Sequence, residues 1–494
     1  MRFCVLPDIA DGVTVRLRIL TAAALLALAA CSGEPAPPPG PQAPAVEASA
    51  LQAAVRDPRV RRFYAARQWR PAWTHEAEAS LNAALNEADR HGLNADDYRR
   101  TFATAREGAA REAALSLAAL DYASALARGK TDPRQLEGIY EIPRPDPDLT
   151  GGLERVLAGN GDVRGWISGL APQDAEYRAL SAAYLEAKRQ MDTPRGQPRQ
   201  ANQTSQADQT NQATEATQTD QAPPTRQAQS DRMRTLAVAL ERLRWLDRAP
   251  ARTRIDVNTA ATTLVYWRDG TPRDTRRVVV GSAGERATPS LATPMFQLIA
   301  NPTWTVPRSI GTSAGYLARH GFVVRNGRRI QPSGPSNALG LVKFDLRNGH
   351  AIYLHDTPSK SLFLRDERHA SHGCVRVHNA LEFAELIARD SGVLDQWQRA
   401  QRAPVVRSRP AEGADGATPA PAPAQRRYVQ RWIPLPHEIP VRLLYHTAFV
   451  ENGQVRIVRD VYGRDERVAI ALGLPPRVRT APRTGTGAPA DVGP

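Results

Sequence analysis

Hydrophobic and polar positions change their spacing along the chain, and these changes divide it into regions. Residues 48–192 are rich in Ala, Leu and Arg with few β-branched runs, which predicts a helical domain. Residues 193–231 are rich in Gln, Thr and Asn with almost no large apolar side chain, so we expect a disordered linker there. A chain of 494 residues is long enough for two or three domains that each bury a core.

The spacing after this linker is first helical and then typical of strands. Four large apolar residues recur three or four positions apart and predict a short amphipathic helix: Met233, Leu236, Leu240 and Leu243. The β-rich runs that follow are 253–257, 262–267, 276–280, 295–300, 341–344 and 351–354. Asp269-Gly270 predicts a turn, and residues 381–389 predict a helix. We therefore expect a mostly β domain over residues 232–402.

A second linker and a hairpin follow this domain. Residues 403–425 are rich in Pro and Ala, so we expect them to be disordered. Two alternating runs, 441–450 and 455–460, flank Asn452-Gly453, which is a strong hairpin signal. We expect this hairpin, within residues 426–474, to complete the β domain.

The predicted architecture is therefore α+β and multidomain. The helical domain at 48–192 precedes the mostly β domain, and residues 475–494 are expected to form a disordered tail. We find no internal repeat along the chain.

The N-terminus has the pattern of a secretion signal. Arg16-Leu17-Arg18 supplies positive charge, and the twelve apolar residues 19–30 follow it. This run is too short to span a bilayer as a helix. It ends in Leu28-Ala29-Ala30-Cys31, which resembles the bacterial lipoprotein box, so we expect residues 1–31 to be a lipoprotein signal and Cys31 to carry the lipid. An ordinary cleaved signal and an uncleaved anchor are the alternatives.

Residues on either side of this signal bear on its start and on the destination of the protein. Asp8 and Asp11 would lie where such signals are basic, so we hypothesise that translation starts at Val15. Residues 32–47 are rich in Pro and Ala and are expected to tether the protein. Ser32 follows the cysteine, which resembles signals sorted onward to the outer membrane. We expect a periplasmic protein, lipid-anchored in the outer membrane of a Gram-negative bacterium.

The net charge of +14 favours anionic partners or a negatively charged membrane surface. The arginines are scattered rather than clustered with aromatic residues, and the sequence has no zinc-finger or RRM-like signature. Nucleic acid is therefore not an expected partner. A basic but otherwise ordinary soluble surface is the alternative explanation of the charge.

Cys374 is the one cysteine expected in the folded body, because Cys4 and Cys31 lie in or beside the signal. An exported protein with one such cysteine forms no intramolecular disulfide there, so the thiol stays free or reactive. Four histidines lie near it in the sequence: His355, His369, His372 and His378. An imidazole beside a thiol can take its proton and leave the nucleophilic thiolate, which indicates nucleophilic chemistry.

His355 is the favoured base for this thiol. Fifteen residues separate it from Ser371-His372-Gly373-Cys374, and a loop of that length can fold back to bring the two side chains together. Gly373 permits a sharp turn before the cysteine, and the amides around Cys374 are candidate oxyanion donors.

Zinc binding is the alternative use of these residues. His369, His372, Cys374 and His378 are residue types that zinc accepts, but their spacing matches no common zinc pattern. A buried, inert thiol is a further alternative. We expect neither a metal nor a cofactor.

These motifs resemble a known family. His355 followed by Ser371-His372-Gly373-Cys374-Val375-Arg376 resembles the signature of L,D-transpeptidases with a YkuD-type catalytic domain. Residues 301–310 and 335–340 resemble the two ends of that family's capping insertion, which would span about 308–340 here. Residues 353–358 resemble the long periplasmic branch that includes YcbB.

The resemblance extends beyond the catalytic signature. Residues 63–73 resemble the helical scaffold domain of that branch, and residues 240–245 resemble the helix that leads into the catalytic domain. Roughly residues 48–192 and 233–473 are covered. One departure is the polar run 193–229, where the branch usually has a small peptidoglycan-binding module. Glycan binding would then depend on the scaffold, on the capping insertion or on general basicity.

The resemblance also implies a role for each matching residue. Cys374 would be the nucleophile and His355 the base that activates it. His372 and Gly373 would supply backbone around the oxyanion of the acyl intermediate. The residues expected to line the substrate cleft are Tyr353, Arg376, Trp304 and Ser371.

The implied reaction is cross-linking of peptidoglycan. The enzyme would release D-Ala from a tetrapeptide stem, form a cysteine acyl-enzyme and transfer the acyl group to a second stem, which gives a 3→3 cross-link. The implied partners are donor and acceptor stems, a membrane through the lipid anchor, and proteins of cell-wall synthesis. Two alternatives stay open: an L,D-carboxypeptidase or endopeptidase of the same fold, and a non-catalytic lipoprotein that tethers outer membrane to wall.

Overall fold

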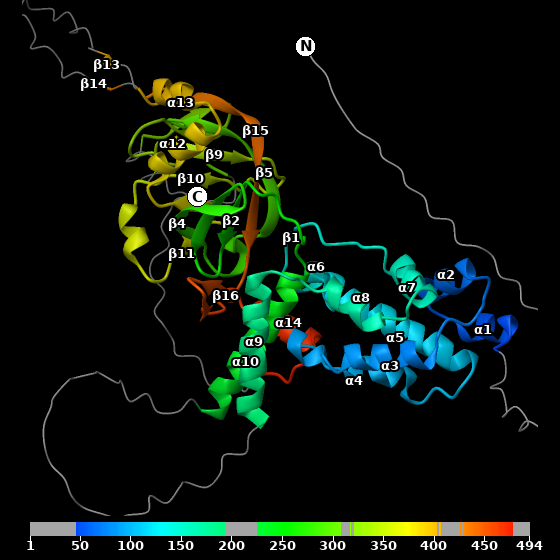
Figure 1. Ribbon diagram of the computed structural model, residues 1–494. Coiled ribbons are helices and arrows are strands. Elements are labelled where there is room, and N and C mark those ends of the chain that lie inside the picture. The colour runs from blue at the N-terminus through cyan, green and yellow to red at the C-terminus, as the bar shows by residue number, and fades with distance from the viewer. Residues whose placement is uncertain are drawn as a thin grey trace, which may run out of the picture. The chain divides into compact units, whose positions relative to one another are not determined.

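The computed structural model describes residues 46–192, 225–307, 317, 321–402, 405–406, 425–426 and 428–477 (Figure 1). The predicted signal, Cys31 and nearly all of the tether lie outside these residues. So do residues 193–224 of the first linker, 308–316 and 318–320 of the expected capping insertion, most of the second linker, and residues 478–494 of the expected tail. Within the described part, no helix is both long enough and apolar enough to cross a bilayer.

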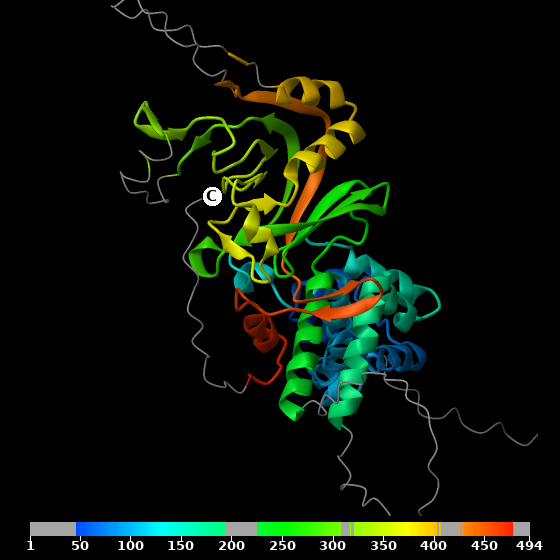
Figure 2. The ribbon, with the colours of Figure 1, turned by 90° about the vertical axis from the view of Figure 1, so that its left-hand side faces the viewer.

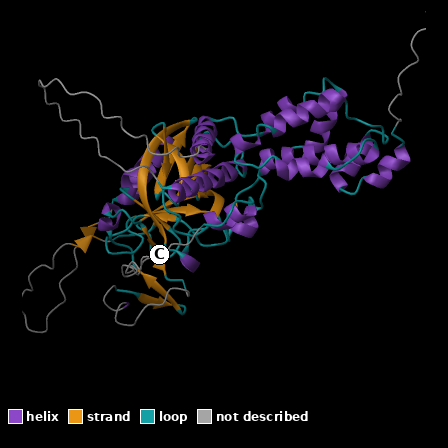
Figure 3. Cartoon of the chain, turned by 90° about the horizontal axis from the view of Figure 1, so that it is seen from below, coloured by secondary structure: helices purple, strands orange, loops and turns teal. Residues whose placement is uncertain are grey.

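Helices make up most of residues 48–192, as predicted, whereas strands dominate after residue 254 (Figure 3). Polar side chains fix where several helices begin. Asp57, Thr74 and Asp162 each accept a hydrogen bond from a first-turn amide, of α2, α3 and α8 respectively. The elements are α1 (Ala48–Ala54), α2 (Pro58–Ala66), α3 (His75–Leu85), η1 (Ala88–His91), α4 (Asp96–Ala103), α5 (Ala109–Arg128), α6 (Pro133–Leu136), α7 (Leu149–Ala158), α8 (Val163–Leu170) and α9 (Ala175–Asp192).

Helix α10 (Arg226–Arg244) follows the first linker and packs along α9 (Figure 2). It begins inside the stretch that we expected to be disordered to residue 231. The Thr225 hydroxyl caps it by accepting a hydrogen bond from the Ala228 amide at 3.2 Å. Leu236 and Leu240 are buried, as the periodicity predicted. Once such apolar turns are packed, extending a helix into polar residues is favourable, so α10 starts earlier than composition alone indicated.

The β domain contains a sheet that closes on itself. Its strand order is β5-β15-β2-β3-β4-β12-β10-β9, and β9 pairs again with β5. Strand β1 pairs parallel to β5 and brings in the chain from the helical region, while β11 pairs parallel to β4. The strands are β1 (Tyr140–Glu141), β2 (Arg254–Asn258), β3 (Thr263–Arg268), β4 (Thr271–Gly281), β5 (Ser290–Ala300), β9 (Val342–Leu346), β10 (Leu354–His355), β11 (His369–Ser371), β12 (Val375–Val377) and β15 (Arg431–Leu444).

Smaller elements accompany this sheet. Helix α12 (Ala380–Asp390), predicted at 381–389, packs Phe383 and Ile387 into the core of the β domain. Strands β7 and β8 of the capping insertion pair with each other, and β8 also pairs with β6 just before the insertion, in the order β6-β8-β7. The remaining elements are η2 (Gly284–Arg286), β6 (Trp304–Thr305), β7 (Val323–Arg325), β8 (Arg328–Gln331), η3 (Lys360–Leu364), α13 (Leu394–Gln401), β13 (Val405–Val406), β14 (Gln425–Arg426), β16 (Ala448–Glu451), β17 (Gln454–Ile457) and α14 (Asp465–Ala471).

Several strands differ from their predicted limits. Strands β4 and β5 each begin five residues before the predicted runs, at Thr271 and Ser290. Of the run 351–354, only Leu354 is in β10, because Ala351 has φ +55°, outside the extended region. Strand β15 begins at Arg431, ten residues before the predicted run at 441. The prolines in this stretch argued against a strand, since proline is rare in paired strands. The pairing with β5 accommodates them with a shift in register between Pro434 and Ile439.

The C-terminal hairpin lies elsewhere than expected. It is formed by β16 and β17 around Asn452-Gly453, but it is β15, not this hairpin, that completes the closed sheet. The hairpin contacts α9 and α10, and Ala448 belongs to the core of the helical region together with Val468 of α14. The expectation that the hairpin completes the β domain is thus corrected: its apolar residues are buried against helices.

Candidate active site

Cys374 lies in a tight turn between β11 and β12, formed by Ser371, His372, Gly373 and Cys374, which we call the cysteine turn. Ser371 closes it: the hydroxyl donates to the Cys374 carbonyl at 2.6 Å and accepts from the Gly373 amide at 3.1 Å. The cysteine is 6 % exposed. The cysteine turn is therefore held rigidly by its own first residue.

Gly373 is required by the shape of this turn. Its φ of +122° lies where residues with a Cβ are rarely found. A Cβ there would also lie 3.3 Å from the Cδ1 atom of Ile352. The amide of Gly373 already binds Ser371, so this residue serves the geometry of the turn.

His355 shares one face of the sheet with Cys374. Strands β10 and β12 run parallel, with His355 opposite Arg376, and the Val375 amide extends this ladder by donating to the Tyr353 carbonyl at 3.1 Å. Side chains alternate along extended backbone. Tyr353 precedes His355 by two residues, and Cys374 precedes Arg376 by two, so we expect all four side chains on the same face. The ring centroids of Tyr353 and His355 are 5.7 Å apart.

The tautomer of His355 follows from its partner. Its Nδ1 atom lies 2.5 Å from the Asp356 carbonyl oxygen, and His355 is fully buried. A carbonyl only accepts, so Nδ1 carries the hydrogen and, in the neutral ring, the basic lone pair is on Nε2.

The Cys374 thiol rests protonated. Burial raises its pKa to about 11, while the neighbouring Tyr353, Lys343 and Arg376 act in the opposite direction. Its Sγ atom is 3.6 Å from the Ala351 carbonyl oxygen, which accepts the thiol hydrogen. Burial, followed by the nearby thiol, also raises the pKa of Tyr353 well above its usual value. A base is therefore needed to form the thiolate near neutral pH.

The remaining residues assigned to the substrate cleft are mostly covered. Arg376 and Trp304 are each 1 % exposed, and Ser371 is likewise buried. Trp304 packs against Leu339 of the capping insertion and against Tyr353, which is half-buried. His372 is half-buried at the start of the cysteine turn.

The other histidines near the cysteine have separate partners. His369 contacts Glu367 through Nδ1 and the Thr259 carbonyl through Nε2, at 3.0 Å for the latter. The ring of His378 lies 5.1 Å from that of Phe363. Among the residues that the structure describes, no group of three or more His, Cys, Asp or Glu is arranged to hold a metal ion.

Sequence analysis missed Thr288. Its hydroxyl donates to the Gly373 carbonyl at 2.9 Å and accepts from the Gly281 amide at 2.8 Å. No motif or periodicity in the sequence singles out this threonine, which lies seven residues after Gly281.

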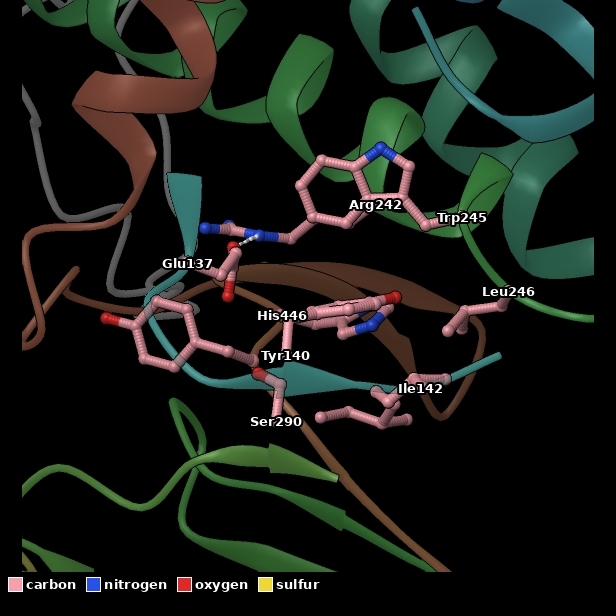
Figure 4. Close-up of a pocket in the computed structure, with 10 residues that line it drawn as sticks. Glu137, Tyr140, Ile142, Arg242, Trp245, Leu246, Ser290 and His446 are labelled. Carbon is pink, nitrogen blue, oxygen red and sulfur yellow. Dashed lines mark hydrogen bonds and ion pairs between the residues drawn. The ribbon is translucent and has the colours of Figure 1, made fainter. Parts of the chain in front are cut away.

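A small pocket lies apart from the cysteine turn, where the helical region, α10 and the end of β15 meet (Figure 4). Glu137 and Arg242 lie across from each other in it, with the guanidinium Nε donating to the carboxylate at 2.8 Å. None of its lining residues belongs to the cysteine turn. This pocket therefore lies between the helical region and the β domain and is not the binding site for a substrate of Cys374.

Comparison with known families agrees with this geometry. Residues 252–406 match the family described as L,D-transpeptidase catalytic domain (YkuD), and residues 58–183 match the family described as scaffold domain. The chain carries an L,D-transpeptidase catalytic domain. The matched range of this L,D-transpeptidase domain ends at residue 406, whereas the sheet is closed by β15, which begins at Arg431 beyond the second linker.

Individual proteins are similar over parts of the chain. A Haemophilus influenzae protein provisionally named an L,D-transpeptidase is 27 % identical over 246 residues, which are 44 % of this chain and 45 % of that protein. The alignment thus spans less than half the length of this relative. Two solved structures align with low TM-scores. One is a cysteine-to-serine mutant of the Enterococcus faecium L,D-transpeptidase, with TM-score 0.20 and 14 % identity, covering 28 % of this chain and 48 % of that one. The other is the Ldtfm-avibactam carbamoyl enzyme, with TM-score 0.19 and 16 % identity, covering 27 % and 44 %.

Proposed function

We propose that this protein is a peptidoglycan L,D-transpeptidase that forms 3→3 cross-links through an acyl-enzyme on Cys374. The observation that carries the proposal is the parallel pairing of β10, which contains His355, with β12, which begins directly after Cys374, inside a domain of this family. The substrates are a donor tetrapeptide stem and the side-chain amine of a second stem. The reaction uses no metal and no cofactor.

The chemistry balances with these two side chains. His355 takes the thiol proton, and the thiolate attacks the carbonyl of donor residue three. The protonated imidazole then gives its proton to the leaving D-Ala amine as the thioester forms. The acceptor amine attacks the thioester, its surplus proton returns through His355, and the new amide forms as the thiol is restored. The tautomer with hydrogen on Nδ1 supports this role, because it leaves the lone pair on Nε2.

We further propose backbone stabilisation of the oxyanion at the cysteine turn. The Cys374 amide is the favoured donor, since the Gly373 amide is bonded to Ser371. Although burial raises the pKa of Cys374, the charge of Arg376 acts in the opposite direction and so favours the thiolate. His372, Tyr353 and Trp304 are proposed to border the bound stem. Because Trp304 is 1 % exposed and packs against Leu339, a stem can contact it only if Leu339 moves.

The decisive experiment follows products formed by the purified full chain from tetrapeptide muropeptides. We expect 3→3 dimers and released D-Ala, and expect both to vanish for Cys374→Ala. Shortened monomers without dimers would instead identify a hydrolase of the same fold. Unchanged muropeptides would favour a non-catalytic tether. Intact mass after incubation with a carbapenem, followed by peptide mapping, reports separately whether Cys374 becomes acylated.

The proposed location is the periplasmic face of the outer membrane, with a lipid on Cys31. The lipoprotein-like run ending at Cys31 supports this proposal. We expect wild type to incorporate labelled palmitate and to sediment with outer membranes, and Cys31→Ala to do neither. A Cys31→Ala variant that still carries label would overturn the assignment.

A further inference from the structure

The structure links the cysteine turn to the chain's C-terminal segment through a set of buried hydrogen bonds. The link begins at Thr288, whose side-chain oxygen accepts from the Gly281 amide and donates to the Gly373 carbonyl. Thr288 is fully buried. Its hydroxyl hydrogen is therefore directed at the cysteine turn.

The planarity of the peptide bond makes this contact informative. The Gly373 carbonyl and the Cys374 amide belong to one peptide unit, in which they point in opposite directions. Gly373 has no Cβ, so the orientation of that unit is only weakly limited by sterics. A hydrogen bond that fixes the carbonyl therefore also fixes the direction of the Cys374 N–H, the proposed donor to the oxyanion.

The Tyr462 hydroxyl bridges the backbones of Thr288 and Gly281. It donates to the Gly281 carbonyl at 2.7 Å and accepts from the Thr288 amide at 3.3 Å. Gly281 has no room for a side chain, because a Cβ would lie 1.9 Å from the Arg286 carbonyl oxygen. The phenol thus closes a compact junction between the end of β4 and the start of β5.

Arg464 continues the link to the helical region. Its guanidinium donates to the Thr288 carbonyl at 3.2 Å and to Glu137 at 3.4 Å, and lies 4.8 Å from the Tyr462 ring. Glu137 follows α6 and also binds Arg242 of α10. The segment that reaches the cysteine turn is therefore anchored on residues of the helical region.

We propose that Thr288 and Tyr462 are positioning residues that aim the Cys374 amide at the oxyanion, and that the C-terminal segment completes the active site in this way. This inference rests on the proposed function. It assigns a catalytic consequence to the segment that carries Tyr462 and Arg464, which lies outside the matched catalytic domain. Neither residue is proposed to touch substrate.

The test compares two reactions of Cys374 in the full-length protein. Carbapenem acylation passes through an oxyanion, whereas alkylation by iodoacetamide displaces iodide and forms none. We expect Thr288→Val to slow acylation about 10- to 100-fold, below the full loss of an oxyanion donor, and to change alkylation less than about threefold. Thr288→Ser keeps the hydroxyl and should restore acylation. Tyr462→Phe should slow acylation by a smaller factor.

Thr293→Val is the matched control. This buried threonine also donates to a backbone carbonyl, that of Arg347 at 2.7 Å, away from the cysteine turn. Thr293→Val should acylate as wild type does. Wild-type acylation rates in Thr288→Val, or equal losses in both reactions that Thr288→Ser does not rescue, would overturn the inference alone. A wild type that is alkylated but never acylated would overturn the proposed function, and this inference with it.

Discussion

The Ser371 hydroxyl donates to the carbonyl oxygen of Cys374 across 2.6 Å, so the first residue of the cysteine turn fixes its last. The Ser371 hydroxyl oxygen also accepts a hydrogen bond from the Gly373 amide, and Ser371 is 1 % exposed. Sequence resemblance assigned Ser371 to the substrate cleft. Its observed contacts show that it also holds the backbone from which the thiol projects.

Replacing Ser371 with Ala should therefore loosen the cysteine turn. Loss of a buried hydrogen-bonding group costs about 1–3 kcal/mol of unfolding free energy, and acylation of Cys374 should slow at least about tenfold. Ser371→Thr retains the hydroxyl and should keep most of the rate. Denaturant unfolding and carbapenem acylation measure the two effects. Ser333→Ala is the control, since that hydroxyl donates to the Asn301 carbonyl at 2.6 Å outside the turn, and equal acylation losses in both Ala variants would contradict the argument.

The pH dependence of thiol alkylation should reveal whether His355 is the base. Burial raises the pKa of Cys374 to about 11, so without a base the thiolate fraction should rise about tenfold per pH unit and level off only near that value. We expect this profile for His355→Ala. In wild type, transfer of the thiol proton to His355 should let the alkylation rate reach its plateau at a lower pH than in His355→Ala. Iodoacetamide rates between pH 6 and 10, where intact folding is checked by circular dichroism, test the difference; superimposable profiles would exclude His355.

Much of this arrangement could be predicted from the sequence, and the failures have physical causes. The spacing of Leu236 and Leu240 predicted α10, because apolar residues four positions apart lie on one side of a helix; that residues 234–244 are buried all around was not predicted. The motif around Cys374 indicated its turn because Gly373 permits the required φ. By contrast, Thr288 and Tyr462 meet only through tertiary folding, 174 positions apart in sequence, so no local pattern marks them.

In other places the local structure was predicted correctly, but the elements that pack against it could not be predicted from the sequence. The Asn452-Gly453 turn was predicted correctly, yet the apolar residues of the hairpin did not reveal that helices would cover them. The first ten residues of β15, 431–440, escaped prediction because their prolines break the usual pattern of a paired strand.

A glycine next to the capping insertion should also control the position of His355. Gly340 has φ +61°, and a Cβ there would lie 2.2 Å from a carboxylate oxygen of Asp356. Asp356 accepts from the Leu341 amide at 3.0 Å, pairs with Lys360, and provides the carbonyl that binds His355. Gly340→Ala should therefore displace Asp356 and the imidazole that depends on it.

We expect Gly340→Ala to lose at least about 1–2 kcal/mol of unfolding free energy from the positive φ alone. Because His355 should also be displaced, we expect acylation of Cys374 to slow. Gly349→Ala is its matched control, because a Cβ there meets nothing within 4 Å. That variant should stay within about 0.5 kcal/mol of wild type. The melting temperature and the acylation rate should therefore be lowered in Gly340→Ala and not in Gly349→Ala. A fully active Gly340→Ala would refute the link between Gly340 and His355.

The ion pairs around Arg242 should dominate the electrostatic stability of the described structure. Its guanidinium binds Glu137 at 2.8 Å and Asp465 at 2.6 Å, with each of these side chains at most 4 % exposed. Although burial opposes the charge, Glu137 and Asp465 raise the pKa of Arg242 above its usual value. Removing one partner of such a buried set leaves the others charged and unsolvated.

Arg242→Met should accordingly cost about 3–5 kcal/mol of unfolding free energy and lower the melting temperature by several degrees. Arg389→Ala removes an exposed pair with Glu385, 2.9 Å long, and should cost at most about 1 kcal/mol. Arg242 connects α10 with residues from the helical region and from α14, so its loss should also slow acylation of Cys374 through the segment that carries Arg464. Equal unfolding midpoints for the two variants would show that the buried cluster contributes no more than a surface pair.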